Sequence, residues 1–533
     1  MTDQMAFSED MLVGLTPEQR EAVMSPARRL LVRATAGSGK THVLTLRIQR
    51  RIAQGEIDAD QVLAMTFTRK AGDELRRRLF RAGIRDIRAG TFHRAALTLV
   101  NQYREDHHLK PLVIEANRRR LVTSLAQQMK DSGDLHLEDW QLPRLEQEIG
   151  WALSQGYNGA LYAKNARRLR RDAPLPAAQF ADVLDRYVGL CRSRGVLDFD
   201  LLLSEAISLL RDDPNVLASF RHRNKSIYVD ETQDMNPLQF MLLRHMAGDE
   251  PDLFCVGDPN QSIYGFNGAN PQLLGEIIRT WPDTVVLDLT RNHRSTANII
   301  AVANTLLEEG ARGIIPAKDD GDVPMVRAYN TDEQEAEHVA TWLSAKHQPG
   351  TPWRSMAVLA RTNAQLELIA GFLDANDVPF ERRGPEHSPA SDLLVPSEVW
   401  TRKPDDDHRD AVALSTIHRS KGLEFQNVAA IGWAEGQLPN YNATTPAQIA
   451  EEQRLAYVAL SRAENSLLIT WSRGRNDPRY PDRAPSRFLA PIEKVIAEIE
   501  QRNAPLTGEA RKARLAAIRR ELEAAVSEGN VSL

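Results

Sequence analysis

The chain has 533 residues, of which 42% are hydrophobic and 26% charged, so it is an ordinary globular sequence with room for about three or four domains. Its net charge of −5 does not indicate a nucleic-acid-binding protein, although a local basic groove would be enough for one. No apolar run approaches the roughly 20 residues that span a bilayer, and the acidic N-terminus lacks the pattern of a secretion signal. Two distant cysteines, Cys191 and Cys255, exclude an iron–sulfur cluster or a zinc site built from cysteine alone. Free thiols are typical of a reducing compartment, so we expect a cytoplasmic protein without membrane contact.

A small-residue loop follows the first apolar strand of the chain. Residues 34–41 read Ala-Thr-Ala-Gly-Ser-Gly-Lys-Thr and are followed by a helical pattern that begins near His42. Glycines in such a loop let backbone N–H groups surround phosphate oxygens, while a lysine neutralises charge and a threonine hydroxyl ligates Mg²⁺. The loop therefore predicts a nucleotide-phosphate site made by Ala36, Gly37, Ser38, Gly39, Lys40 and Thr41.

A second strand, residues 227–229, ends in the adjacent carboxylates Asp230 and Glu231. Asp230 is suited to hold the metal ion, and Glu231 is suited to orient and deprotonate an attacking water. The loop and the carboxylate pair together predict a nucleoside triphosphatase.

Short apolar runs alternate with helical patterns along most of the chain, which indicates an α/β fold with parallel sheets. Residues 100–195 differ, because their Arg- and Leu-rich helical pattern contains no strand-like run. A second α/β unit is expected to begin near residues 285–289. Residues 381–410 have the composition of a linker or surface loop, and residues 507–526 have the pattern of an amphipathic helix that docks on the protein. The expected strands are residues 62–68, 87–93, 253–258, 356–360, 412–415, 428–431 and 467–470.

The order of the motifs resembles that of superfamily 1 DNA helicases of the UvrD/Rep type, over nearly the whole chain. The phosphate loop is accompanied by segments that match this family in sequence and in order: residues 15–19, 66–71, 90–93, 230–234, 257–266, 292–295, 416–425 and 457–463.

The resemblance implies two RecA-like P-loop parallel-sheet domains, with a helical insertion in the first. The first RecA-like domain (1A) would comprise residues 1–99 and 196–282, with the insertion (1B) at residues 100–195. The second (2A) would comprise residues 283–380 and 411–490, interrupted by a linker at 381–410 and followed by a helical tail at 491–533. The implied activity is that of an ATP-dependent 3′→5′ DNA helicase with ATP and Mg²⁺ as its cofactors. Its implied partners are single-stranded DNA and 3′-tailed duplex DNA.

The resemblance also assigns roles around the nucleotide. Arg294 and Arg462 would reach the γ-phosphate from the second domain, so hydrolysis would require the two domains to close. Gln261 would sense the γ-phosphate, Glu424 would bind the ribose, and Gln19 would read the adenine edge. His42 occupies a position where many relatives carry an arginine that stacks on adenine, and His293 one where relatives usually carry a tyrosine. Both histidines keep a flat π surface that is able to stack on a base.

Contacts to DNA are implied for residues in both domains. Single strands are held by aromatic stacking above a groove that follows the phosphates. Asn267 stands where relatives usually carry an arginine, which predicts a weaker phosphate contact. The implied DNA contacts are Phe67, Arg69, Thr91, His93, Tyr264, Phe266, Thr416 and His418.

One departure from the family is architectural. About fifty residues separate Arg361 from Val412, too few for the large helical 2B subdomain that UvrD and Rep carry there. A second interpretation is therefore a translocase or DNA-end sensor that hydrolyses ATP but unwinds poorly. It would act as the motor subunit of a repair or antiviral complex with a separate nuclease, since no nuclease pattern follows residue 462. A third interpretation, a P-loop kinase or metabolic ATPase, leaves the second-domain arginines without a role.

Overall fold

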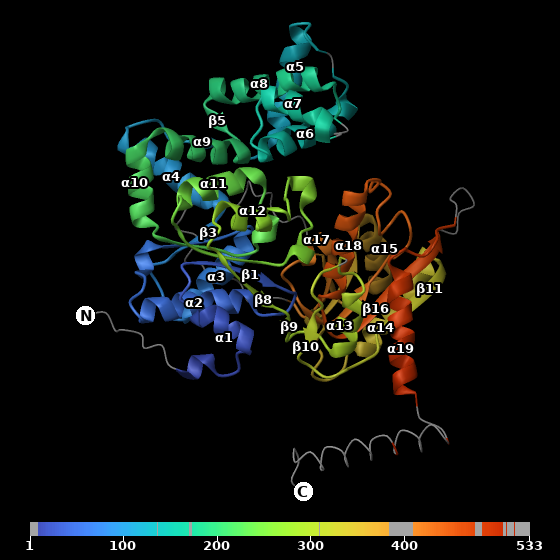
Figure 1. The fold of residues 1–533 in the computed structure, drawn as a ribbon. Helices are drawn as coiled ribbons and strands as arrows, with labels where there is room; N and C mark the ends of the chain where they lie inside the picture. Colours follow the sequence, from blue (N-terminus) through green and yellow to red (C-terminus); the bar gives the residue numbers. More distant parts are fainter. Residues whose placement is uncertain are drawn as a thin grey trace.

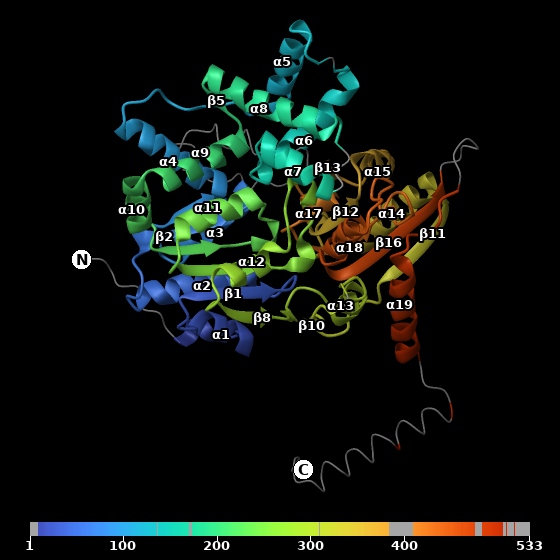
Figure 2. The same ribbon diagram turned by 45° about the horizontal axis from the view of Figure 1, so that its top comes forward.

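The computed structural model describes residues 9–135, 137–169, 173–308, 310–382, 409–474 and 482–504, together with Gly508 and Ala516. Two α/β units lie side by side, and a helical unit sits above the first of them (Figure 1). Turning the molecule brings this helical unit forward and exposes the two sheets beneath it (Figure 2). The mixed α/β architecture with two parallel sheets confirms the expected fold class.

The first sheet is parallel throughout and has the order β3-β2-β6-β7-β1-β8. Every residue of β2, β6 and β7, three of its four inner strands, is buried, which explains why they read as continuous apolar runs. Because the strands are parallel, the loops at their carboxyl ends meet at one edge, where ligands of such sheets bind. The strands are β1 (Arg29–Ala34), β2 (Val62–Thr66), β3 (Arg88–Thr91), β6 (Ser226–Val229), β7 (Asp252–Gly257) and β8 (Val285–Leu289).

The strand at residues 285–289 corrects one expectation. It was expected to open the second sheet, but β8 pairs in parallel with β1, with Leu30 opposite Val285. The prediction that this strand belongs to the sheet of the second unit is wrong. Sequence pattern identifies a strand but not its neighbour, and here the chain adds an edge strand beside β1 before it leaves the first unit.

Helices cover both faces of the first sheet. Alternate residues of β1 face opposite sides, so that Leu31 packs with one helical layer while Leu30 and Val32 pack with the other. The first layer contains α4 (Phe92–Asp106), α9 (Phe199–Asp212), α10 (Pro214–Arg223), α11 (Pro237–Ala247) and α12 (Leu273–Thr280). The second layer contains α1 (Pro17–Met24), α2 (Lys40–Ala53) and α3 (Arg69–Arg81).

The helical unit has a separate core, built around Tyr162, Phe180 and Tyr187. Its helices are α5 (Arg118–Asp131), α6 (Leu142–Ser154), α7 (Gly159–Leu169) and α8 (Ala177–Arg194). The expectation that residues 100–195 contain no strand is wrong, because β4 (Val113–Ile114) pairs with β5 (Val196–Leu197). Two residues are too few to give a period-2 pattern, and this short ladder joins the unit to the first sheet domain.

The second sheet is also parallel, with the order β11-β16-β15-β12-β14-β13. Its strands are β11 (Met325–Thr331), β12 (Met356–Ala360), β13 (Phe380–Arg382), β14 (Val412–Thr416), β15 (Phe425–Ala430) and β16 (Ala463–Gly474). Its helices are α13 (Ala297–Asn304), α14 (Asp332–Lys346), α15 (Asn363–Ala375), α17 (Ile417–Ser420), α18 (Pro446–Leu460) and α19 (Leu489–Asn503). A two-stranded ladder of β9 (Arg291–Asn292) and β10 (Ile315–Pro316) lies beside the first unit.

Two predicted segments fall mostly outside the described residues: the linker at 381–410 and the amphipathic helix at 507–526. Within the described part of the chain, none of the helices combines the length and apolar character needed to cross a membrane.

Candidate nucleotide cleft and nucleic-acid interface

The phosphate loop joins β1 to α2. Gly37 and Gly39 have φ angles of +67° and +78°, in the left-handed region where glycine carries no steric cost. Gly39 is the N-cap of α2, so the unpaired N–H groups of that helix face the loop. The Ser38 hydroxyl donates to the Thr35 carbonyl at 2.7 Å and fixes the curve of the loop.

Thr41 and Asp230, the two residues expected to hold a metal ion, lie next to each other. The Thr41 hydroxyl donates to Oδ2 of Asp230 at 3.0 Å, so two oxygen atoms converge on one point. Burial, reinforced by the charge of Glu231, raises the pKa of Asp230 to about 6, a cost that a bound cation would remove. Within the described residues no cluster of three or more His, Cys, Asp or Glu side chains could hold a metal. Magnesium fits this sparse site, because it is usually held by one or two protein oxygens together with phosphates and waters.

Glu231 is held in its ionised form. Burial opposes ionisation, but the charges of Lys40 and Lys421 outweigh it and lower the pKa of Glu231 to about 2. Its carboxylate lies 3.8 Å from the Lys40 ammonium and accepts a hydrogen bond from the Gln233 amide at 2.5 Å. The residue has a φ angle of +52°, a strained conformation of the kind that gathers at functional sites.

Gln261 lies in the short helix after β7, where its amide donates to Oδ2 of Asp258 at 2.7 Å. Asp258 in turn donates its backbone N–H to Oε1 of Gln233 at 2.9 Å. A short chain of hydrogen bonds therefore links the residue expected to sense the γ-phosphate with the carboxylate of Glu231.

Both expected arginines reach the cleft from the second unit. Arg462 is 1% exposed and donates to neutral acceptors only, namely two backbone carbonyls and the Ser461 hydroxyl. Burial and the nearby Arg294 lower the pKa of Arg462 to about 9, as expected for a buried cation that lacks an adjacent anion. Arg294 is paired at 2.7 Å with Glu424, whose side chain is 57% exposed. The pairing places Glu424, the residue expected to bind ribose, next to Arg294, one of the two arginines expected to reach the γ-phosphate.

The residues expected around adenine differ in their exposure and in their hydrogen bonds. His42 and His293 are exposed, and the backbone N–H of His293 donates to the Gly37 carbonyl at 2.9 Å. Gln19 is buried, and both ends of its amide are engaged: its Oε1 accepts from the Thr16 backbone, and its Nε2 donates to the Ser38 carbonyl at 2.9 Å. In this arrangement Gln19 fixes the phosphate loop to α1.

One cavity of about 1050 Å³ joins the nucleotide residues to half of the expected DNA contacts. Phe266 is 49% exposed there, with its ring edge-on to His418 at 5.5 Å. The cavity also contains Tyr264 and Thr416, so an aromatic surface adjoins the phosphate site.

The other four expected DNA contacts lie outside this cavity. Phe67 packs against Phe92, with ring centroids 5.6 Å apart, and Thr91 lines a separate pocket. His93 packs edge-on against Phe199, and burial lowers its pKa to about 4. Arg69 lies 3.8 Å from Asp73, one turn along α3.

Comparison with known proteins identifies the family. The UvrD/REP helicase N-terminal domain matches residues 15–282, and the UvrD-like helicase C-terminal domain matches residues 287–386 and 399–474. The chain belongs to the UvrD/REP helicase family. The resemblance drawn from the sequence motifs is thereby confirmed.

Relatives in this family cover the chain to different extents. The ATP-dependent DNA helicase UvrD2 of Mycobacterium tuberculosis is 31% identical, over 96% of this chain and 85% of that protein. DNA helicase II of Escherichia coli is 30% identical over 70% of this chain and 52% of its own length. UvrD1 of M. tuberculosis is 32% identical over 70% of this chain and 50% of its own length.

Several contacts of this UvrD-type cleft were not predicted. Lys421 lies within a recognised motif but received no role, although it lowers the pKa of Glu231. Asn292 donates to the Ala36 carbonyl at 2.7 Å, and the Tyr457 hydroxyl lies 3.4 Å from the Ala36 amide. Only the motif that contains each residue could have indicated them, because their partners are far away in sequence.

Proposed function

We propose that this chain is an ATP-driven motor that moves 3′→5′ on single-stranded DNA and unwinds 3′-tailed duplexes. The observation that carries the proposal is the single cavity that contains the phosphate loop, Glu231, Arg462 and the exposed ring of Phe266. Membership of the UvrD/REP helicase family supports the use of ATP and DNA. The direction of movement rests on the resemblance to UvrD and Rep.

Within the cleft, the side chains divide the work of phosphoryl transfer to water. Lys40 and the N-terminus of α2 neutralise phosphate charge, and Glu231 is ionised and able to take a proton from the attacking water. Thr41 and Asp230 would hold Mg²⁺, which would supply neutralisation of phosphate charge. Arg462 brings a buried guanidinium that suits the charge developing on the γ-phosphate.

The motion follows from the origin of these residues in two units. Lys40 and Glu231 belong to the first unit, whereas Arg294 and Arg462 belong to the second, so the complete charge arrangement exists only when the units are close. Release of products would remove the anion that the arginines share with the phosphate loop. The units would then separate and close again on the next ATP, which is the motor stroke we propose.

Contacts of the segment at residues 262–266 support a direct link between the nucleotide and DNA. It belongs to the first unit, but α18 of the second holds it: Glu451 accepts from the Gly265 backbone and Arg454 donates to the Ser262 carbonyl, both at 2.8 Å. A displacement of the second unit would therefore move Phe266 at the DNA surface.

A second candidate function is a translocase or DNA-end sensor that unwinds little and works with a partner such as a nuclease. The observation that favours it is that only residues 383–411 connect β13 to β14, neighbouring strands of one sheet. This is too short for a large regulatory subdomain of the 2B kind.

ATPase and unwinding measurements separate these possibilities. The proposal expects single-stranded DNA to stimulate ATP hydrolysis strongly, and a 3′-tailed duplex to be unwound when a 5′-tailed duplex is not. Stimulation without unwinding of either duplex favours the translocase. ATP hydrolysis indifferent to DNA contradicts both.

A further inference from the structure

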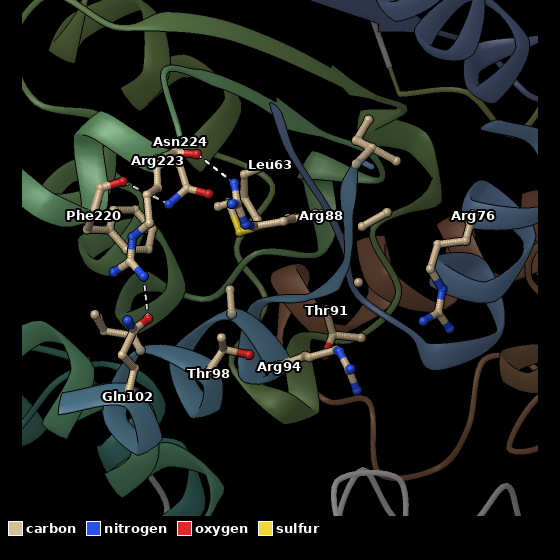
Figure 3. A pocket seen from close by; sticks show the side chains of 16 residues that line it. Leu63, Arg76, Arg88, Thr91, Arg94, Thr98, Gln102, Phe220, Arg223 and Asn224 are labelled. Atoms are coloured by element: carbon tan, nitrogen blue, oxygen red, sulfur yellow. Dashed lines mark hydrogen bonds between the residues drawn. The ribbon is translucent and has the colours of Figure 1, made fainter. Parts of the chain in front are cut away.

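A second cavity, of about 360 Å³, lies at the outer edge of the first sheet. It is bounded by the edge strand β3, its neighbour β2, helix α4 and the C-terminal end of α10 (Figure 3). Its volume falls within the range of small-ligand pockets, roughly 300–1,000 Å³. None of the roles assigned to the nucleotide cleft involves it.

The walls of this pocket combine apolar and cationic side chains. The apolar part suits a flat hydrophobic group and consists of Leu63, Met65, Ile87, Ala89, Ala95, Leu99 and Phe220. The lining of the pocket contains no carboxylate. It contains four arginines: Arg76, Arg88, Arg94 and Arg223. Burial and the neighbouring Arg76 lower the pKa of Arg94, although Asp73, which is paired with Arg76, acts in the opposite direction, so positive charge predominates at this end of the pocket. An anionic group would be stabilised there.

The arginines differ in their engagement. Arg88 donates to backbone carbonyls of Asp60 and Arg223, and Arg223 donates to Gln102, so this pair is held in the wall. Arg94 lies beside Thr91 at the opposite end, and Arg76, which is paired with Asp73, lies farther along (Figure 3). The pocket therefore has a cationic end near Thr91, which is itself an expected DNA contact.

Asn224 gives the other end of the pocket a specific requirement. It is 7% exposed, and its Nδ2 donates to the Phe220 carbonyl at 2.8 Å as a cap of α10. Its Oδ1 is buried and accepts no hydrogen bond from the described residues. Figure 3 shows this oxygen directed toward the side of Leu63. A buried acceptor without a donor is costly, so a ligand with an N–H group would be favoured at this point.

We propose that this pocket holds one nucleotide of the bound DNA strand, with its phosphate at Arg94 and the exocyclic amine of its base donating to Oδ1 of Asn224. An apolar wall, a buried acceptor and a cationic end together match a base and its phosphate. Because Nδ2 is committed to the helix cap, Asn224 offers the base one acceptor only. Adenine, cytosine and guanine carry an exocyclic amine and thymine does not, so the pocket gives the motor a base preference. The inference rests on the proposed function, because it assumes a strand that passes Thr91.

The test compares a short oligomer of deoxyadenosine with the matching oligomer of purine deoxyriboside, which lacks only the amine. Affinities for the full-length protein are measured by fluorescence anisotropy at one salt concentration, because phosphate contacts make affinity salt-dependent. One neutral hydrogen bond predicts that deoxyadenosine binds about 3- to 10-fold more tightly. The Asn224→Leu variant should lose this preference, and Asn224→Asp, which keeps an acceptor, should retain a preference for the amine.

The chain offers a matched control for the helix cap. Asn376 caps α15 through an Nδ2 hydrogen bond to the Phe372 carbonyl, also at 2.8 Å, but its side chain is exposed and lines neither cavity. The Asn376→Leu variant loses the same cap and should keep the preference for deoxyadenosine. Equal affinity of wild-type protein for both oligomers, or a preference that persists in Asn224→Leu, overturns the proposal.

Two further experiments test whether the nucleotide in the pocket belongs to the DNA strand and which of the two proposals has failed. The Thr98→Trp variant, whose side chain would fill the pocket, should lose the preference for the deoxyadenosine oligomer, while its ATP hydrolysis without DNA stays unchanged. A pocket that binds free dAMP but gives the strand no preference overturns the strand as its source. If neither oligomer binds at all, the proposed motor function has failed. If both bind equally and in a salt-dependent way, only the pocket assignment has failed.

Discussion

The Lys421 ammonium lies 2.6 Å from Oδ2 of Asp234, across the boundary between the two α/β units. The same ammonium donates to the Gln261 carbonyl at 2.6 Å and lies 5.1 Å from the centroid of the Tyr264 ring. Both members of the ion pair are almost fully buried. One lysine of the second unit therefore contacts two segments of the first unit, residues 230–234 and 257–266, that are expected to act on nucleotide and DNA.

This ion pair predicts a pH-dependent loss of stability when it is broken. Burial raises the pKa of Asp234 to about 7, although Lys421 acts in the opposite direction. Removing the lysine raises that pKa further. At about pH 5 the folded-state Asp234 carboxyl is protonated in both proteins, so Lys421→Met loses only the interaction of Lys421 with the ionised Glu231 and should lower Tm less than at about pH 9, where the variant also leaves the buried Asp234 charge unpaired. At about pH 9 the free energy of unfolding of the variant should fall by roughly 3–5 kcal/mol relative to wild type.

Thermal unfolding at the two pH values measures this effect. The matched control is Lys346→Met, which breaks an exposed pair with Asp322 at 2.9 Å and should change Tm slightly at both pH values. Equal Tm losses for Lys421→Met at the two pH values would show that Asp234 is not the group left unpaired.

Replacement of the base tests the chemistry of the cleft. We expect Glu231→Gln to abolish ATP turnover while nucleotide binding remains, because glutamine keeps the shape but cannot accept the proton of the attacking water. Lys40→Ala should abolish turnover by removing phosphate charge stabilisation. Phosphate release measures both, with Glu435→Gln, part of an exposed pair with Arg487, as the control. Turnover by Glu231→Gln within a few-fold of wild type removes Glu231 from the mechanism.

The sequence predicted the parts of this site that depend on local spacing. The phosphate loop from Ala36 to Thr41 and the pair Asp230–Glu231 are short segments at the ends of recognisable strands, and their geometry follows from the strand, turn and helix around them. Sheet membership of β8 could not be predicted, because an apolar strand fits beside several neighbours. The contact of Lys421 with Asp234 spans 187 residues and exists only after both units have folded and met.

Residues that the sequence assigned to the same role differ in their burial. Phe266 and His93 were both expected to contact DNA, and of the two only Phe266 is about half exposed and lines the main cavity. His93 packs against Phe199, which follows it in the chain by more than a hundred residues. Aromatic residues in a motif thus indicate a region, whereas their exposure depends on distant packing partners.

Arg462 is expected to act on the transition state. Its guanidinium is buried among neutral acceptors, so no hydrogen-bonded carboxylate offsets its positive charge, and that charge acts fully on an incoming γ-phosphate. We expect Arg462→Ala to lower kcat by about 10³-fold or more while ATP affinity changes far less. Arg462→Lys keeps the charge and most of the volume but loses the planar fork, so its kcat should also fall. Steady-state kinetics and ATP binding are measured together, and a variant that loses affinity but keeps kcat makes Arg462 a ground-state contact.

Tyr264 and Phe266 should have separable roles, although their rings are only 6.1 Å apart. The Tyr264 hydroxyl donates to the His418 carbonyl at 3.2 Å, so it joins the two units, whereas Phe266 is half exposed toward the cavity. Phe266→Ala should weaken single-strand affinity by about 1–3 kcal/mol, the value of one stacked base, and regain full ATPase stimulation at saturating DNA.

Tyr264→Phe should do the opposite: it keeps the ring and the affinity, but loses the hydrogen bond between the units and therefore blunts stimulation even at saturating DNA. Arg69→Ala serves as the reference for a variant that loses only DNA affinity. Its loss of affinity should depend on salt, and its ATPase should be fully stimulated at saturating DNA. ATPase titrations with single-stranded DNA at two salt concentrations distinguish the three variants. Full stimulation of Tyr264→Phe would place the transmission between nucleotide and DNA elsewhere, with the Lys421 contacts to Asp234 and Gln261 as the next connection to break.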